Sequence, residues 1–389
     1  MVIDHKPMNM KRNLVILVFG ILFSLPSHSQ MNAGIQTDSI NKIYVGTYTR
    51  KEGHVDGKAK GIYLINQNPS TGELKFVGTA AEMTNPSFVK VGKMGKYLFA
   101  VSELGPGDGE SGFIHSFEIL KDGALRNISK LGTGGYAPCH IALDRSGKFA
   151  FVSNYMGGVV MVYKINTDGS LEKNQEIKLE NPDAAHAHSV KVSGDNRYAY
   201  IADLGNDKIW VYDFDRMEGK LQPHRQGAVE LKKGAGPRHM SLAKNGSFAY
   251  SINELNSSLS VFAIKEHGGL EHIQDISSLP QSYRNKNSAA DIHIHPGGNF
   301  LYASNRGHNS IAAFKIDAET GKLSTIDHFP IAGETPRNFA ISPFGRYLYA
   351  ASQDTGNITT YKIDPNTGKL KVQPRVFEIK TPVCLEFVK

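Results

Sequence analysis

The residues best suited to chemistry lie in one short stretch, GPRHMSLAKNGSFAYSINELN, residues 236 to 256. The stretch is predicted to be a β-hairpin, because two alternating apolar strands flank an Asn-Gly pair that favours a tight turn. Such a hairpin returns the chain to where it began, so Arg238 and His239 should lie beside Asn253 and Glu254. A guanidinium, an imidazole and a carboxylate in one place can bind an anion and transfer a proton.

The same hairpin pattern recurs along the chain. An aromatic residue opens the second strand of each copy, and these aromatics stand about 50 residues apart, a spacing typical of repeat proteins. They are Tyr97, Phe149, Tyr198, Phe248, Phe300 and Tyr347. A third apolar strand and a more polar fourth strand follow each hairpin. Four antiparallel strands per repeat is the unit of a β-propeller blade.

The two ends of the sequence set the number of blades. Residues 42 to 80 contain second, third and fourth strands without a first, and residues 381 to 389, TPVCLEFVK, match a first strand. The last strand is therefore predicted to complete the first blade and close the ring, which removes free strand edges. We predict an all-β, seven-bladed propeller over residues 31–389. Its longest irregular stretches are expected at residues 50 to 60 and 105 to 112, the second as a flexible surface turn.

Charge and the N-terminal residues narrow the class of function. The formal net charge is +7, without a long basic run or a nucleic-acid recognition motif. This fits a small anionic substrate and argues against nucleic acid. Within the predicted signal peptide, residues 1–30, the stretch from 11 to 29 shows two basic residues, a short apolar run, a proline and small residues, the layout of a signal peptide.

A membrane anchor is the alternative interpretation of this segment, but the apolar run is short for a spanning helix. We therefore expect an exported, periplasmic protein with no membrane attachment after the signal is removed. Without processing of the N-terminus, the protein would be cytoplasmic.

The first strand of each blade lies nearest the propeller axis, so residues that open first strands should converge on one mouth of the central channel. They are Ser87-Phe88, Cys139-His140, Ala187-His188, Arg238-His239, Ala290-Asp291 and Arg337-Asn338. The ends of the second strands add Glu103, Asn154, Asp203, Asn253-Glu254, Asn305-Arg306 and Gln353. Arginines so close together must either pair with carboxylates such as Asp291 and Glu254 or bind an anionic ligand, and we favour the ligand.

Some of these side chains also have a structural interpretation. Asn154, Asp203 and Asn305 precede turns, where such side chains commonly bond to nearby backbone groups. His140 and His188 could equally be hydrogen-bonded residues of the channel wall.

Other reactive side chains give weaker signals. His186 and His188 share a strand face, but no third ligand stands at a recognisable spacing, so no metal site is predicted. Cys139 and Cys384 fall on inner strands two blades apart, and no disulfide is assumed. The serines lack the context of a nucleophile elbow, so a serine hydrolase triad is not expected.

Four unusual runs, GPRH, NELNSS, AADIHI and SNRG, carry a family resemblance. With their surroundings they resemble the seven-bladed propeller lactonases, a family that includes bacterial 6-phosphogluconolactonase and, in a fungal branch, 3-carboxy-cis,cis-muconate cyclase. The resemblance extends from about Lys42 to the C-terminus. It implies hydrolysis of a small anionic sugar δ-lactone to the open acid, with no required metal or organic cofactor.

The resemblance also implies a site. The catalytic candidates are Glu254, His188, His239 and Arg238, and the substrate-binding candidates are Arg306, Arg337, Asp291, His293 and His140. The catalytic His, Glu and two Arg proposed for the fungal branch correspond to His188, Glu254, Arg238 and Arg306.

Lactone hydrolysis needs a base for water and donors for the developing oxyanion. We interpret Glu254 or His188 as the base and His239 as the other proton-handling group. Arg238 and Arg306 would hold the oxyanion or a carboxylate, and Arg337 a phosphate.

Two other classes of function remain open. One is a non-catalytic propeller that uses the ring of charges to bind a ligand, and the other is a muconate-type cycloisomerase. The expected export also departs from the cytoplasmic role of a phosphorylated sugar substrate, which raises an unphosphorylated lactone as an alternative.

Overall fold

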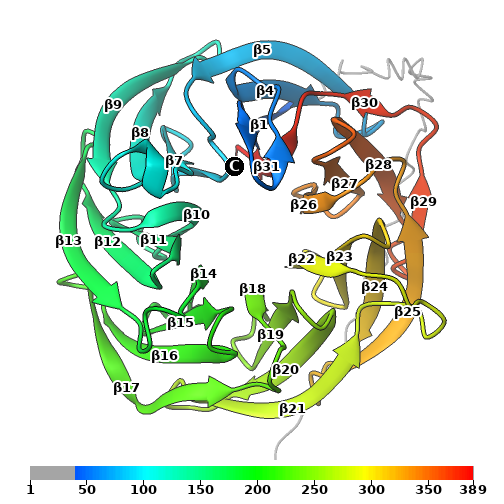
Figure 1. Ribbon diagram of the computed structural model, residues 1–389. Helices are drawn as coiled ribbons and strands as arrows, with labels where there is room; N and C mark the ends of the chain where they lie inside the picture. The colour runs from blue at the N-terminus through cyan, green and yellow to red at the C-terminus, as the bar shows by residue number, and fades with distance from the viewer. Residues whose placement is uncertain (1–39, 389) are drawn as a thin grey trace, which may run out of the picture. The chain divides into compact units, whose positions relative to one another are not determined.

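The computed structural model describes residues 40–388, so the predicted signal peptide at residues 1–30 lies outside the described residues. Within them, seven antiparallel sheets follow one another around a central axis (Figure 1). Each sheet has four strands in sequential order, and one sheet gains a short fifth strand. The predicted seven-bladed propeller is confirmed.

The first four blades contain these strands. Blade one has β1 (Asn41–Thr47), β4 (Gly61–Gln67) and β5 (Leu74–Glu82), completed by β31 (Pro382–Phe387). Blade two has β6 (Val89–Val91), β7 (Tyr97–Ser102), β8 (Phe113–Ile119) and β9 (Leu125–Gly132). Blade three has β10 (Tyr136–Leu143), β11 (Phe149–Met156), β12 (Val159–Ile165) and β13 (Leu171–Lys178). Blade four has β14 (Ala187–Val192), β15 (Tyr198–Asp203), β16 (Lys208–Asp215) and β17 (Lys220–Glu230).

The last three blades repeat this order. Blade five has β18 (Pro237–Leu242), β19 (Phe248–Asn253), β20 (Ser258–Ile264) and β21 (Leu270–Ser277). Blade six has β22 (Ser288–Ile294), β23 (Phe300–Arg306), β24 (Ser310–Ile316) and β25 (Leu323–Pro330). Blade seven has β26 (Pro336–Ile341), β27 (Tyr347–Ser352), β28 (Asn357–Ile363) and β29 (Leu370–Val372), and β30 (Phe377–Glu378) also pairs with β28.

The ring closes as the sequence predicts. Strand β31, near the C-terminus, pairs antiparallel with β1, and Leu385 stands opposite Val45. It thereby supplies the innermost strand of blade one, and no blade is left with three strands. Figure 1 shows β31, β10, β14, β18, β22 and β26 around the centre, with the fourth strands at the rim.

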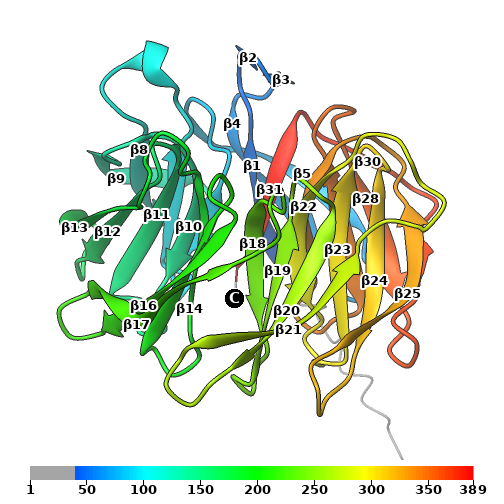
Figure 2. The same ribbon diagram turned by 60° about the horizontal axis from the view of Figure 1, so that its bottom comes forward.

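The two stretches predicted to be irregular are partly ordered. Residues 50 to 60 contain a small hairpin, β2 (Lys51–Glu52) with β3 (Val55–Asp56), and residues 105 to 112 contain one 3-10 turn, η1 (Pro106–Asp108). The prediction of irregular structure was therefore wrong for the first stretch, because two-residue strands leave no periodic signal. Both features stand on the same face of the propeller (Figure 2), where Arg50 forms an ion pair with Asp108.

The hydrophobic core is divided among the blade interfaces. Each pair of neighbouring blades encloses its own cluster of buried apolar side chains, and the one between blades five and six includes Tyr250, Ile252, Ala289 and Leu301. Packing between neighbours, repeated around the ring, is what a repeat protein uses in place of one central core. The channel at the axis is thus free to be lined by polar side chains.

The recurring aromatics make the contact that sets this packing. Phe248 lies against the turn glycine of the next blade, Gly321, where an added Cβ would come within 2.3 Å of the ring. Gly321 has a φ of +70°, a conformation that favours glycine. The neighbouring Tyr250 hydroxyl donates to the Gly321 carbonyl at 3.0 Å. The period of about 50 residues therefore records a blade-to-blade contact.

The structural interpretation of the strand-end side chains holds. Asp203 accepts hydrogen bonds from the Trp210 indole at 3.0 Å and from the His186 backbone at 2.9 Å. Asn154 donates to two backbone carbonyls, and Asn305 to one, at 2.7 to 3.1 Å. Asn154 and Asp203 thereby stabilise the turns that follow them, whereas Asn305 bonds to Ser278, which follows the last strand of the preceding blade. Both cysteines are buried and free, as assumed.

Among residues 40–388, no helix is long and apolar enough to cross a membrane.

Candidate active site

A β-bulge near the start of the first strand builds one layer of the channel wall. In blades four, five and seven the register shifts across a single residue, and that residue is His188, Arg238 or Arg337. A bulged residue is unpaired and its side chain is redirected from the regular alternation. The bulges therefore place one histidine and two arginines at equivalent positions.

The bulge also corrects one alignment made from the sequence. His140 follows the bulged residue of its own blade, Cys139, so it is equivalent to His239 and not to His188. The prediction that paired His140 with His188 was wrong by one residue. The separation between His140 and His188 is one residue shorter than the separation between Phe149 and Tyr198, the aromatic residues that open the second strands of the same two blades.

A second layer is formed by one residue from each blade, the residue directly after the polar one that ends the second strand. In blade order these residues are Tyr48, Glu103, Tyr155, Leu204, Glu254, Arg306 and Gln353. Several of them contact the bulged residues, as described below. In blades three, four and five the strand-end residue bonds within the following turn. In blades one, three and five the next residue contacts a bulged residue.

Glu254 joins two arginines from neighbouring blades. Its Oε2 accepts from Arg238 Nε at 2.8 Å, as the hairpin prediction requires, and its Oε1 lies 2.9 Å from Arg306 Nη2. The Ser288 hydroxyl also donates to Oε1 at 3.0 Å. Arg238 is only 2% exposed, and its Nη1 donates to the Ala290 carbonyl at 2.7 Å. The carboxylate therefore holds two guanidinium groups in fixed positions.

The electrostatics of this group follow from burial and charge. Burial by itself would raise the pKa of Glu254, but the charges of Arg306, Arg238 and Arg337 outweigh it and bring the pKa to about 2. Burial, with Arg306 and Arg337 nearby, lowers the pKa of Arg238 to about 10. Glu254 is thus ionised and Arg238 protonated at neutral pH.

Arg337 differs from the other two arginines. Within residues 40–388, no hydrogen bond or ion pair reaches its guanidinium, which lies 5.7 Å from the centre of the Tyr48 ring. The Tyr48 hydroxyl donates to Glu103 Oε1 at 2.8 Å, and Glu103 Oε2 is buried without a partner in the same part of the chain. A cation and an acceptor oxygen are therefore both available to a ligand here.

His188 lies between this layer and the channel histidines. Its ring packs edge-on against Tyr155 at 5.7 Å and against His239 at 5.3 Å. Its Nδ1 lies 3.7 Å from Cys139 Sγ. Burial, with Arg238, His239 and Arg337 nearby, holds the pKa of His188 well below its usual range. The imidazole is therefore neutral at pH 7 and able to accept a proton.

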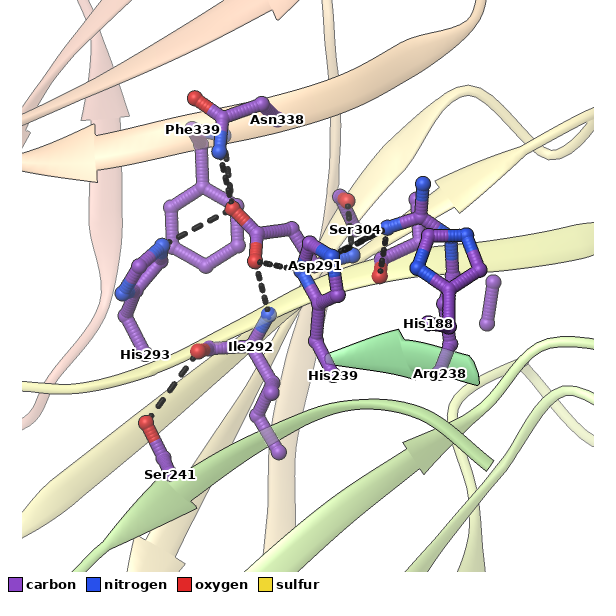
Figure 3. Close-up of polar contacts among 12 residues, drawn as sticks. His188, Arg238, His239, Ser241, Asp291, Ile292, His293, Ser304, Asn338 and Phe339 are labelled. Atoms are coloured by element: carbon purple, nitrogen blue, oxygen red, sulfur yellow. Dashed lines mark hydrogen bonds and ion pairs between the residues drawn. The ribbon is translucent and has the colours of Figure 1, made fainter. Parts of the chain in front are cut away.

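Asp291 organises the next layer down the channel (Figure 3). Its two carboxylate oxygens contact His239 Nδ1 at 2.8 Å and His293 Nε2 at 2.9 Å, and the Asn338 amide donates to it as well. His239 Nδ1 must carry the proton in this contact, which leaves Nε2 to accept from Arg238 Nη1 at 3.2 Å. Burial and Arg238 lower the pKa of His239 to about 3.

These contacts bear on the predicted roles. Both nitrogens of His239 and both oxygens of Asp291 are engaged by protein groups. His140 packs against Phe88 and His239, with a buried Nδ1 that has no partner in the described part of the chain. His239, Asp291, His293 and His140 thus form the wall beneath the arginines. Their roles toward a substrate remain predictions.

The structure adds Tyr48, Tyr155 and Ser288 to the candidate residues. Tyr48 and Tyr155 occupy the same position in their blades as Glu254 does in its own, so strict alignment on the repeated hairpin would have found them. Ser288 contacts both Glu254 and Arg306 at 2.9 to 3.0 Å, and no repeat pattern marks it.

A large cavity adjoins this mouth. It has a volume of about 1020 Å³ and lies between the β2–β3 hairpin and residues 353–357. His54 lines it and contacts Tyr48 edge-on, and Tyr48 also contacts Arg337. Arg238, Arg306, Arg337 and Glu254 do not line this cavity, so it is a space beside the mouth and not the arginine site itself. Among residues 40–388, no group of three His, Cys, Asp or Glu is arranged to hold a metal ion.

A propeller whose channel mouth holds paired arginines, an unpaired arginine and a neutral histidine has groups that can bind an anion and transfer a proton. Comparison with known proteins makes this specific. The family described as "Lactonase, 7-bladed beta-propeller" matches residues 42–387. The chain belongs to this lactonase family.

Individual relatives agree with this assignment. A 6-phosphogluconolactonase of Formosa agariphila is 36% identical over 77% of this chain and 86% of its own length. The solved periplasmic gluconolactonase PpgL of Pseudomonas aeruginosa is 31% identical, with a TM-score of 0.83 over 90% of this chain and 99% of that one. A putative 6-phosphogluconolactonase of Bacteroides fragilis is also 31% identical, with a TM-score of 0.82 over 91% and 99%. These relatives indicate lactonase activity.

Proposed function

We propose that the protein hydrolyses a sugar δ-lactone that carries an anionic group, with 6-phosphogluconolactone as the first candidate. The observation that carries this proposal is the Arg337 guanidinium, which has no carboxylate partner in residues 40–388 although Arg238 and Arg306 share one. A guanidinium at the channel mouth that forms no hydrogen bond or ion pair with the described residues suits a phosphate or carboxylate.

We assign the role of base to His188 and a positioning role to Glu254. Both Glu254 oxygens are bound by arginines, and with a pKa of about 2 its carboxylate is a weak base. His188 is neutral, and the positive charges of Arg238 and Arg337 contribute to its low pKa. An anionic substrate would offset those charges and raise the basicity of His188 when it is needed.

The reaction then proceeds in two proton transfers. His188 takes a proton from water as the water oxygen bonds to the lactone carbonyl carbon, and the carbonyl oxygen becomes an oxyanion. Arg238 Nη2 and Arg306 Nη1 have no partner among residues 40–388 and are the donors for that oxyanion. The intermediate collapses, the bond from carbon to ring oxygen breaks, and the ring oxygen takes the proton from His188.

The test compares freshly made 6-phosphogluconolactone with glucono-δ-lactone, with spontaneous opening subtracted. For the Arg337→Gln variant we expect KM for the phosphorylated lactone to rise by about tenfold or more, because one charge-assisted contact is lost, with little change for the other lactone. His188→Gln should abolish turnover of both. Arg346→Gln, at an exposed arginine, serves as the matched control.

Other outcomes point to other functions. If neither lactone is turned over, the hydrolase proposal fails and a ligand-binding propeller becomes the better interpretation. Product analysis with a carboxylated muconate distinguishes a cycloisomerase from a hydrolase. A cycloisomerase would give a cyclised product that contains no added water.

We also propose that the protein is exported and acts in the periplasm. The support is the layout of residues 1–30 and the name of the Pseudomonas relative, a periplasmic gluconolactonase. An exported enzyme would need its anionic lactone outside the cytoplasm, so turnover of the unphosphorylated lactone alone would contradict the proposed anionic substrate. Cell fractionation and N-terminal sequencing of the full-length product test this. A cytoplasmic protein that retains its first residues would contradict it.

A further inference from the structure

The channel has a second mouth, at the far end of the first strands. Side chains along a strand alternate between faces, so residues two positions beyond the Asp291 layer face the channel again. In blade order from blade two these are Lys90, Ala142, Lys191, Ser241, His293, Ala340 and Glu386. Two alanines among longer side chains leave open space.

That space is a separate cavity. It has a volume of about 230 Å³, and its lining includes Lys90, Arg145, Lys191, His293 and Glu386. The same cavity touches His140, His239 and Asp291, which divide it from the arginines at the first mouth. It is smaller than a pocket for a drug-sized ligand, so it suits an ion or a very small molecule.

The charges in this cavity do not balance. Lys90 forms an ion pair with Glu386 at 2.8 Å. The other carboxylate, Asp291, already has both oxygens occupied by His239, His293 and Asn338. Two cations, Arg145 and Lys191, are therefore left without a carboxylate in this part of the structure.

Lys191 is the less satisfied of the two. Arg145 Nε donates to the Ser193 carbonyl at 3.3 Å, whereas within residues 40–388 no hydrogen bond or ion pair reaches Lys191 Nζ. Burial and the nearby charge of Lys90 lower the pKa of Lys191 to about 8. A partly buried ammonium without a partner is costly, and a bound anion would remove that cost.

We propose that this second mouth is a binding site for a small oxyanion of the carboxylate or phosphate class, held by Lys191 with Lys90 and Arg145 beside it. The site is distinct from the arginine mouth, because the wall of His140, His239 and Asp291 lies between them. It is joined to that mouth by contacts from Asp291 through His239 to Arg238.

Binding of inorganic phosphate, with sodium gluconate as the carboxylate probe, tests the proposal by calorimetry. The experiment uses the full chain with the Arg337→Gln substitution, which removes the free cation of the first mouth. Because it measures anion binding and not turnover, its result does not depend on whether the protein is a lactonase. We expect this variant to bind one probe anion, and we expect Lys191→Met in the same background to weaken binding by about tenfold or more. Lys58→Met, at an exposed lysine, should leave binding unchanged.

Two results would overturn the proposal: no binding by the Arg337→Gln variant, or unchanged affinity after Lys191→Met. Unfolding temperatures of each variant show whether it has folded. A labelling experiment on the unaltered chain gives an independent answer. Pyridoxal phosphate, an anionic aldehyde, should form a borohydride-reducible adduct at Lys191 at least about tenfold faster than at Lys58, since more of a low-pKa amine is unprotonated.

Inorganic phosphate should slow that labelling at Lys191 and leave Lys58 unaffected. Equal labelling rates at Lys191 and Lys58, or no protection by phosphate, would contradict an anion site at this mouth.

Discussion

Two buried carboxylates, Glu254 and Asp291, occupy successive layers of the same channel and have different surroundings. Glu254 is held by two arginines, which carry permanent charge. Asp291 is held by two imidazoles and an amide, none of which carries the permanent charge of a guanidinium. One carboxylate therefore fixes the positions of cations, and the other fixes the tautomers and orientations of histidines. The charged groups available to a substrate therefore lie in the first layer, whereas the second layer holds histidines in fixed orientations.

Replacing Glu254 should have the largest effect. In Glu254→Gln the two arginines lose their shared counter-ion and repel each other, so we expect kcat/KM for the lactone to fall by about 10²–10³-fold. Steady-state kinetics with spontaneous opening subtracted measures this. Glu334→Gln, at an exposed glutamate, is the control. Unchanged turnover would show that the paired arginines take no part in the reaction.

Replacing Asp291 should affect stability more than chemistry. An Asn side chain has one acceptor oxygen, so in Asp291→Asn at least one of the two histidines loses its partner. We expect the free energy of unfolding to fall by about 2–4 kcal/mol, measured by urea denaturation, with a smaller loss of turnover than in Glu254→Gln. Asp183→Asn, on the surface, should change neither quantity. If Asp291→Asn reduced turnover strongly but left the free energy of unfolding nearly unchanged, the proposed contrast between the two carboxylates would be reversed.

A change of solvent rather than of sequence also tests the second layer, because stability should depend on pH. The pKa of His239 is about 3 in the folded protein against an ordinary 6.5, so the unfolded chain binds more protons between these values. This contribution is complete above pH 6.5 and is lost as the pH falls toward 3, by at most about 1.4 kcal/mol per pH unit. Glu254 adds a loss of the same sign only below its ordinary value of 4.5, since its folded pKa is about 2.

Unfolding curves from pH 7 to pH 4 separate these contributions. His239→Gln should show a shallower fall in stability between pH 6.5 and 4.5 than the unaltered chain, whereas His267→Gln, at an exposed histidine, should not. A slope unaffected by His239→Gln would mean that this histidine does not resist protonation in the folded protein.

Several features were predictable from local pattern. The blade count, the closure by β31 and the contact of Arg238 with Glu254 all follow from repeated hairpins, since a hairpin fixes which residues face each other. The local roles of Asp203 and Asn154 follow from their place before turns.

The sequence by itself thus determined the blade, its repetition and the contact of Arg238 with Glu254 within one hairpin. Only the tertiary structure decided how residues of different blades combine: Glu254 with Arg306, Asp291 with His239, and Tyr48 with Glu103. It also decided that Arg337 and Lys191 are left without a partner in the described residues. The reason is physical, because pairing across blades depends on the bulges and on packing between sheets, and neither has a sequence period of its own.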